Sequence, residues 1–225
     1  MIKKNGWDNY SIWEHSSIVK ELYKKRCRQE IPEMTCHAQA IELLRPHIVD
    51  GDSVLDVGCG SGYFFHSLVS RKISVEYWGI DSSCSLIDIG REELGKFQLQ
   101  PDKLQNIRIE DVDGTFDHII CINVLSNIDN YHKPLERMLK MSKKTVLLRE
   151  SIKDKSEYAY VHDRYLDCGV SLNVHVNHYG QNEILEFIGR YGYEAQIVTD
   201  LRTGGNSEMV IDHPHYWKFI LAKRR

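Results

Sequence analysis

The residues with the clearest chemical content surround a glycine-rich turn. Residues 54–63 read Val-Leu-Asp-Val-Gly-Cys-Gly-Ser-Gly-Tyr, and Asp56 stands two positions before the first glycine. Glycines accept positive φ and carry no Cβ, so their backbone can approach a ligand closely. Asp81 ends the next apolar run about 20 residues later, where a carboxylate can accept hydrogen bonds from ribose hydroxyls. The combination predicts a site for an adenosine-containing ligand.

The spacing of the glycines distinguishes two kinds of adenosine ligand. Dinucleotide binders carry Gly-x-Gly-x-x-Gly and hold a pyrophosphate at a helix N-terminus, whereas Gly62 comes one residue too early for that pattern. Asp56 would repel a pyrophosphate but suits the ammonium group of an amino-acid moiety. None of the 12 tyrosines has a lysine four residues later, as a short-chain-type dehydrogenase would. A sulfonium cofactor is therefore favoured over NAD, and a dehydrogenase is the weakest alternative.

These residues need a scaffold in which strand ends meet, and the middle of the chain predicts one. From residue 53 onward, short apolar runs alternate with amphipathic segments, which is typical of a doubly wound, mostly parallel sheet. Runs that are apolar almost throughout indicate strands covered on both faces. Strands are expected at residues 53–57, 75–80, 106–110, 117–122 and 145–148, and helices at 63–71, 83–94 and 134–141.

The two ends of the chain differ from this alternating middle. Apolar residues recur at helical spacing before Pro46, which predicts N-terminal helices. Near the C-terminus, a helix at 183–191 precedes two β-rich segments, 194–199 and 216–222, which fit an antiparallel edge pair. We therefore expect one α/β domain with a seven-stranded sheet. Its parts are an N-terminal helical cap (1–47), a cofactor-binding core (48–150), a lid inserted after the fifth strand (151–180) and a C-terminal helix with edge strands (181–225).

Composition limits the classes of function. The chain has 225 residues, a length that is enough for one domain with its own core. Its formal net charge of −3 weighs against a non-specific nucleic-acid binder. No run approaches the roughly 18 apolar residues of a membrane span, and no secretory signal is recognisable at the start. The six cysteines form no Cys-x-x-Cys pair, so reduced thiols and a cytoplasmic location are expected. We expect neither nucleic acid nor membrane as a partner, and the oligomeric state is not predicted.

Several segments resemble the motifs of one family. Residues 54–62 resemble the first motif of class I S-adenosylmethionine-dependent methyltransferases, and residues 79–83, Gly-Ile-Asp-Ser-Ser, resemble the second. Residues 110–112 match the third-strand position of the family, and residues 116–128 are similar to the fourth strand and following loop of the small-molecule (type 11/12-like) branch. The resemblance covers residues 50–150. It implies a Rossmann-like methyltransferase fold and S-adenosyl-L-methionine as cofactor, with S-adenosyl-L-homocysteine as product.

The resemblance also implies roles for individual positions. Asp81 would hold the ribose diol, and Asp111 would face the adenine amino group. Tyr10 and Trp13 would lie on a segment that folds over the cofactor. The expected cofactor contacts are Tyr10, Trp13, Asp56, Gly58, Cys59, Gly60, Gly62, Asp81, Ser82, Asp111, Val112 and Asn123.

The segment expected to form the lid is dense in aromatic and hydrogen-bonding side chains, which predicts a cover over a polar acceptor. Arg149 and Arg164 have the geometry to grip a carboxylate or phosphate. Histidine as a residue type titrates near neutrality, so His175 and His178 are the candidates for a catalytic base. They lack a third ligand at suitable spacing, so no metal site is expected. The expected substrate contacts are Arg149, Tyr160, Arg164, Tyr165 and Tyr179.

The expected reaction is methyl transfer to an oxygen or nitrogen atom of a small polar metabolite, one that carries a carboxylate or phosphate. Two alternatives stay open. One is a methyltransferase acting on RNA or protein, which the acidic net charge disfavours. The other is a non-catalytic subunit that binds the cofactor, because an intact glycine turn implies cofactor binding but does not by itself imply turnover.

Overall fold

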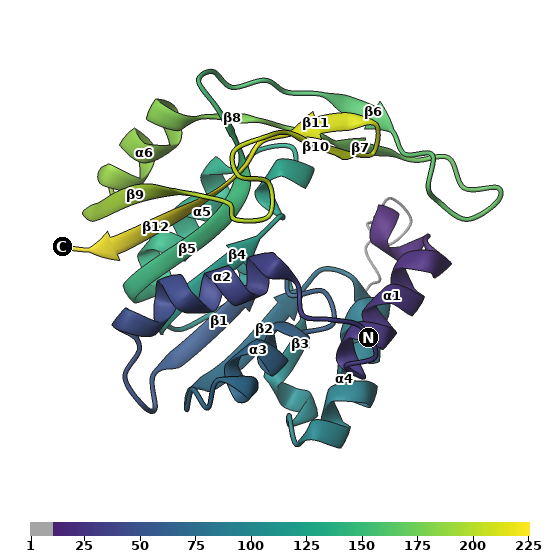
Figure 1. Cartoon of the computed structure of the whole chain (residues 1–225), viewed down its shortest axis with the longest axis horizontal. Helices are drawn as coiled ribbons and strands as arrows, with labels where there is room; N and C mark the ends of the chain where they lie inside the picture. Colours follow the sequence, from purple (N-terminus) through teal and green to yellow (C-terminus); the bar gives the residue numbers. More distant parts are fainter. Residues whose placement is uncertain (1–10) are drawn as a thin grey trace.

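The computed structural model describes residues 11–225, and one sheet with helices on both faces organises them (Figure 1). Tyr10, an expected cofactor contact, lies outside the described residues. The strands of the main sheet are β1 (Ser53–Val57), β2 (Glu76–Asp81), β3 (Leu104–Asn106), β4 (Phe116–Ile122), β5 (Ser142–Lys153), β9 (Tyr193–Thr199) and β12 (Trp217–Arg224).

The strand order is β3-β2-β1-β4-β5-β12-β9, and a two-residue strand, β8 (Tyr179–Gly180), pairs with the end of β5. The first five strands of this order are parallel to one another. β12 runs antiparallel to both β5 and β9. The predicted mostly parallel, seven-stranded sheet with antiparallel edge strands is confirmed. In a parallel sheet the carboxyl ends of neighbouring strands meet at one edge, which is where ligands bind in this class of fold.

Helices cover the two faces of the sheet and enclose two cores. The elements are α1 (Ser17–Cys27), α2 (Thr35–Leu44), α3 (Phe64–Ser70), α4 (Cys84–Leu94), α5 (His132–Met141) and α6 (Gln181–Gly189). Buried residues of α2, α3 and α4, among them Ile41, Leu68 and Ile87, belong to one hydrophobic cluster. Buried residues of α5 and α6, such as Leu135 and Ile188, belong to another cluster. Side chains of the sheet strands belong to both clusters as well, as the apolar runs predict.

Two predicted strands differ from the observed ones. The third strand ends at Asn106, and Ile109–Asp111 forms a 3-10 turn where the sequence analysis placed strand residues. The side chain of Ile109 is buried although it belongs to this turn. The alternation of apolar and polar residues that predicted a strand is therefore explained by a turn that packs on the core. The fifth strand runs much further than expected, to Lys153, because β12 pairs along it as far as Ser151.

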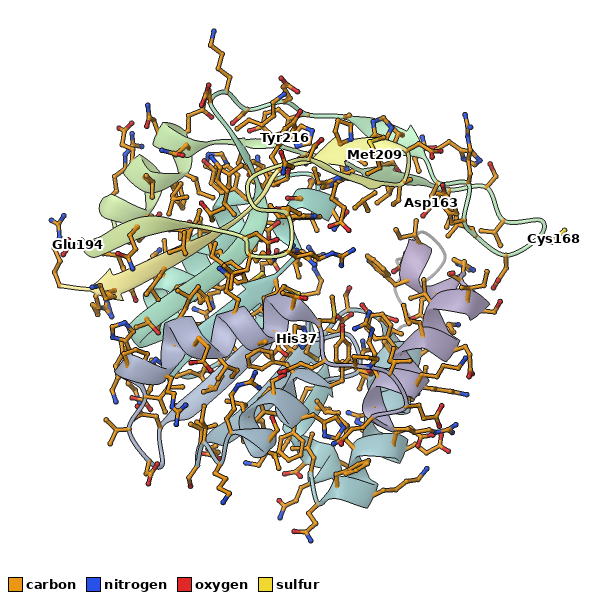
Figure 2. The ribbon with its side chains drawn as sticks, viewed as in Figure 1. His37, Asp163, Cys168, Glu194, Met209 and Tyr216 are labelled. Atoms are coloured by element: carbon orange, nitrogen blue, oxygen red, sulfur yellow. The ribbon has the colours of Figure 1, made fainter. Side chains whose placement is uncertain are left out.

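Two short hairpins lie beyond the carboxyl edge of the sheet. The first, β6 (Tyr160–His162) with β7 (Asn173–His175), lies in the insertion after β5, and the second joins β10 (Glu208–Val210) to β11 (His213–His215). They lie side by side at the top of Figure 1, and Figure 2 labels Asp163, Cys168 and Met209 on them. We call residues 154–178 and 208–215 the roof. The sequence analysis missed the second hairpin because its turn residues, Ile211 and Asp212, have positive φ without being glycine.

No helix within residues 11–225 combines the length and the apolar character needed to cross a membrane.

The contact between α4 and the turn after β1 depends on a glycine. A Cβ at Gly90 would lie 2.2 Å from the carbonyl oxygen of Ser61 and 2.7 Å from Cδ1 of Leu104. The helix therefore packs with its backbone directly on the glycine-rich turn.

Replacing Gly90 by Ala should lower the free energy of unfolding by about 1–3 kcal/mol, because the added methyl group must push α4 away from a backbone carbonyl. Thermal or urea unfolding measures this change. Gly95→Ala is the matched control, because a Cβ there meets nothing within 4 Å. Equal stability of the two variants would contradict the close packing of α4.

Candidate functional site

The glycine turn after β1 lies where three segments converge. Gly58, Gly60 and Gly62 have φ values of +70°, +59° and +76°. A Cβ on Gly58 would lie 2.3 Å from Cγ2 of Val124, in the loop after β4, and one on Gly60 would lie 2.1 Å from Cε1 of Tyr23, on α1. The turn therefore needs glycine both for its conformation and for the close approach of α1 and the β4 loop.

Asp81 at the end of β2 is held against this turn. Its Oδ2 accepts a hydrogen bond from the amide of Gly60 at 2.8 Å, and its Oδ1 accepts one from the amide of Ser83 at 2.8 Å. Burial raises the pKa of Asp81 to about 6, although both hydrogen bonds oppose the shift. A carboxylate fixed in this way has lone pairs left to accept further hydrogen bonds, and its binding of ribose hydroxyls stays a prediction.

Asp56 on β1 is buried beneath the turn. Its Oδ2 accepts a hydrogen bond from the hydroxyl of Tyr77 at 2.8 Å. Burial raises the pKa of Asp56 to about 7, and the nearby charge of Asp81 adds to the rise. Cys59 is also buried, and burial together with both carboxylates raises the pKa of its thiol. A neutral thiol is a poor nucleophile, so Cys59 fills space in the turn.

Asn123 follows β4 and has an unusual conformation, with φ at +60°. Its Oδ1 accepts a hydrogen bond from Nη1 of Arg149, whose Nε binds Oδ2 of Asp200 at 2.7 Å. Arginine only donates, so the amide group of Asn123 points its NH₂ away from Arg149. Arg149 and Asp200 are 3% and 0% exposed. The guanidinium that was expected to grip an acceptor is thus already paired.

Glu150 organises the loop after β4 and was not predicted. Its carboxylate is fully buried and accepts hydrogen bonds from the amides of Val124, Leu125 and Ser126 and from the hydroxyl of Ser126, at 2.7–3.1 Å. Burial raises the pKa of Glu150 to about 7, although these hydrogen bonds act to lower it. The sequence did contain a signal, because Glu150 is a charged residue that closely follows the apolar run of β5, and this strand continues to Lys153.

The two candidate bases lie in different surroundings. Nδ1 of His178 is 2.6 Å from Oγ of Ser151, which also accepts a hydrogen bond from the amide of Tyr216 at 2.9 Å. Burial lowers the pKa of His178, so its ring is neutral at pH 7. His175 packs on the exposed ring of Tyr160, with centroids 4.5 Å apart.

The other predicted residues are distributed around this edge. Trp13 packs against both the α2–α4 core and a small cluster that Ile12 forms with Val174 and Val176 of the roof. Ser82 lies between Asp81 and the start of α4 and is half-buried; Val112 is buried, and Asp111 is exposed in the adjacent 3-10 turn. Arg164 and Tyr165 are exposed on the roof, and both face Asp212. Tyr179 is fully buried, and its hydroxyl donates to the carbonyl of Leu125.

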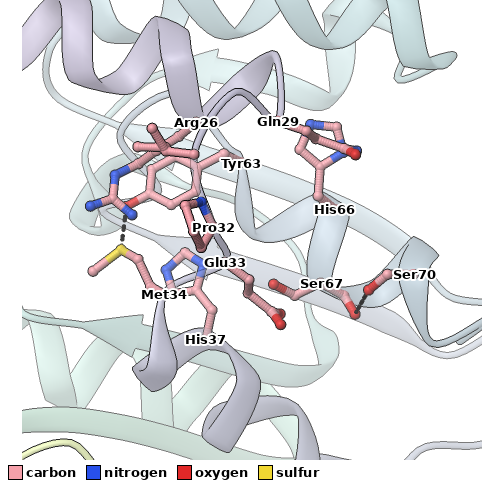
Figure 3. Close-up of a pocket in the computed structure, with 11 residues that line it drawn as sticks. Arg26, Gln29, Pro32, Glu33, Met34, His37, Tyr63, His66, Ser67 and Ser70 are labelled. Carbon is pink, nitrogen blue, oxygen red and sulfur yellow. Dashed lines mark hydrogen bonds between the residues drawn. The ribbon is translucent and has the colours of Figure 1, made fainter.

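A cavity beside the turn exposes further residues that the sequence analysis missed (Figure 3). It has a volume of about 300 Å³ and lies between α1, α2 and α3. The guanidinium of Arg26 lies 5.2 Å from the ring centroid of Tyr63, and its buried Nε has no hydrogen-bond partner within residues 11–225. The ring of His37 stacks on that of Tyr63, with ring centroids 4.8 Å apart. The spacing of Tyr23 and Arg26 by three residues places them on one face of α1 and could have indicated this site.

The arrangement of sheet, glycine turn and Asp81 is that of a Rossmann-like methyltransferase fold. A solved S-adenosylmethionine-dependent methyltransferase from Clostridium acetobutylicum has the same fold, with a TM-score of 0.63 and 15% identity over 92% of this chain and 97% of that chain. Magnesium protoporphyrin IX methyltransferase from Synechocystis, solved with bound S-adenosylmethionine, has a TM-score of 0.59 and 15% identity over 99% and 92% of the two chains. At this identity the likeness concerns the fold.

A family model described as a methyltransferase domain matches residues 26–196. The chain belongs to this methyltransferase family, whose cofactor is S-adenosylmethionine. The predicted family and cofactor are thereby confirmed.

Curated relatives match shorter parts of the chain. The mitochondrial ubiquinone biosynthesis O-methyltransferase of Saccharomyces cerevisiae is 37% identical over 34% of this chain and 25% of its own length. A ribosomal protein L11 methyltransferase of Thermotoga neapolitana is 25% identical over 52% of this chain and 44% of its own length. The chain therefore spans less than half the length of these two relatives.

The raised pKa of Asp81 predicts a pH-dependent affinity for S-adenosylhomocysteine. Asp81 is charged above about pH 6, and only the charged form accepts hydrogen bonds from both ribose hydroxyls. Affinity measured by titration calorimetry should therefore fall as the pH drops from 8 to 5. Asp81→Asn should weaken binding at pH 8 by about 1–3 kcal/mol and reduce this pH dependence.

Asp113→Asn serves as the control, because Asp113 is an exposed acid outside the turn. An unchanged dissociation constant for Asp81→Asn at pH 8 would remove Asp81 from the cofactor site.

Proposed function

We propose that this chain transfers a methyl group from S-adenosylmethionine to an oxygen or nitrogen atom of a small polar metabolite. The observation that carries the proposal is the position of the roof. The chain's own insertion and hairpin lie beyond the carboxyl edge of the sheet (Figure 1). Asp56, Asp81 and Asn123 lie at or just after the carboxyl ends of β1, β2 and β4. A site covered by short hairpins favours an acceptor small enough to fit beneath them.

The residues at the turn fit the parts of the cofactor. Asp81 would accept hydrogen bonds from the ribose, and Asp56 would face the ammonium group. Arg26, whose Nε has no hydrogen-bond partner within residues 11–225, would bind the carboxylate. The bound cofactor supplies a methyl group on a sulfonium, which is reactive without further activation.

Under this proposal the protein contributes mainly alignment. Holding the acceptor in line with the reactive methyl group can lower the barrier by roughly 7–11 kcal/mol in favourable cases. An acceptor that carries a proton also needs a base. His178 is our first candidate, because burial keeps its ring neutral and Ser151 fixes its orientation. His175 is the second candidate. Tyr160, Arg164 and Tyr165 remain proposed acceptor contacts from the roof.

A protein acceptor is the second candidate function. It is favoured by the matches to ribosomal protein L11 methyltransferases, which cover about half of this chain. The net charge of −3 gives no reason to expect a basic ribosomal protein or an RNA in preference to a small molecule. Incubation with S-adenosylmethionine and either small polar metabolites or purified ribosomal protein L11 distinguishes the two candidates by which mixture forms S-adenosylhomocysteine.

His178→Gln should lower turnover about a hundredfold or more with an acceptor that must lose a proton. Affinity for S-adenosylhomocysteine should stay the same, because the substitution leaves the turn intact. Single-turnover rates and calorimetry measure the two effects, and His162→Gln, an exposed histidine of the same insertion, is the control. Equal rates for His178→Gln and wild type at every pH would rule out His178 as the base.

Arg26→Met should weaken binding of S-adenosylhomocysteine about tenfold, the value of a lost charge-assisted hydrogen bond. Binding of 5′-methylthioadenosine should be unaffected, because this nucleoside lacks the amino-acid portion. Lys25→Met removes the same charge from the exposed neighbour on α1 and should change neither affinity. Equal losses for the two ligands in Arg26→Met would show that Arg26 does not bind the carboxylate.

A further inference from the structure

The segment that leads into the first residue of α1 contacts the start of α4, next to Asp81. We call residues 11–17 the strap. Oε1 of Glu14 accepts hydrogen bonds from Oγ of Ser83 at 2.6 Å and from the amide of Ser85 at 3.2 Å. The amide of Ser83 in turn donates to Oδ1 of Asp81. A single residue therefore separates the strap from the carboxylate proposed to hold the ribose.

The other end of the strap is bound to the roof. The carboxylate of Asp167 accepts hydrogen bonds from the amide of Ser17 at 2.9 Å and from its hydroxyl at 2.7 Å, and the amide of Asp167 donates to the carbonyl of His15 at 2.9 Å. Ser17 is the first residue of α1. Asp167 thus places a negative charge at the N-terminus of a helix that lies 150 residues earlier in the chain, where the helix dipole stabilises it.

Apolar contacts and the second hairpin complete the connection. Ile12 of the strap forms a buried cluster with Val174 and Val176 of the roof, and Ile211 packs against this cluster. The hydroxyl of Tyr165 donates to Oδ1 of Asp212 at 3.1 Å. Ile211 has a φ of +51°, which is costly for a β-branched residue and is maintained only when the surrounding contacts impose it. Strap, insertion and hairpin therefore hold one another in place.

We propose that Asp167 is a positioning residue that couples occupancy of the cofactor site to closure of the roof, by way of the strap. This inference rests on the proposed function. A ribose bound to Asp81 fixes Ser83, Ser83 fixes Glu14, and the strap then presents the amide of Ser17 to Asp167. The cofactor binds first, and the acceptor site forms under the roof as a consequence.

Hydrogen exchange of the full chain with saturating S-adenosylhomocysteine tests this coupling. In the wild type, the ligand should slow amide exchange both at the start of α4 and in residues 157–178 of the roof. In Asp167→Ala it should slow exchange only at α4, and the dissociation constant should rise about fivefold, as for loss of a helix cap. Asp154→Ala removes an exposed acid from the start of the same insertion and should behave as wild type.

Ser17→Pro tests the same link without touching the roof. Proline is tolerated at the first position of a helix, and Ser16 before it is already extended, so α1 should persist while both donors to Asp167 are lost. It should reproduce the exchange pattern of Asp167→Ala. Protection of the roof in both variants would overturn the coupling. Protection at α4 without protection of the wild-type roof would also overturn it. Absence of S-adenosylhomocysteine binding to the wild type would overturn the proposed function as well.

Discussion

The hydrogen bond from the amide of Gly60 to Asp81 is the contact on which the rest of the site depends. It ties the turn after β1 to the end of β2 at 2.8 Å, and it forms because Gly60 has a φ that other residues rarely adopt. The surrounding elements are built on the turn in this conformation. Tyr23 lies on Gly60, Val124 lies on Gly58, and α4 packs on the carbonyl of Ser61. A shift of the turn would move all three.

The carboxyl edge of the sheet is also where the structure concentrates buried charge. Glu150 offsets the loss of its hydration with four hydrogen bonds from one loop, and Arg149 does so with Asp200 and Asn123. Removing charges from water is costly unless hydrogen bonds replace those to water. Glu150, Arg149 and Asn123 are therefore held by hydrogen bonds within the protein itself, which limits how far these three groups must reorganise during the reaction.

The sequence predicted the parts of this molecule that are encoded locally. The glycine pattern and Asp81 identify the turn, the cofactor and the family, and β1 falls on the residues expected. Contacts between distant segments were not predictable in the same way. Glu150 is recognisable only once the loop after β4 folds over it, and Asp200 only once β12 pairs with both β5 and β9. Asp167 resembles any loop acid until α1 is placed next to it.

The position of β12 has a consequence for biosynthesis. This strand follows both β5 and β9 in the sequence, yet it lies between them in the sheet. While a ribosome is still making these residues, β5 has an open edge of unpaired amide and carbonyl groups, and such edges associate with other chains. β9 meanwhile has no neighbour, since its pairing partner is β12. The nascent chain can complete its sheet only after residue 224 has left the exit tunnel, because β5 and β9 are joined through β12.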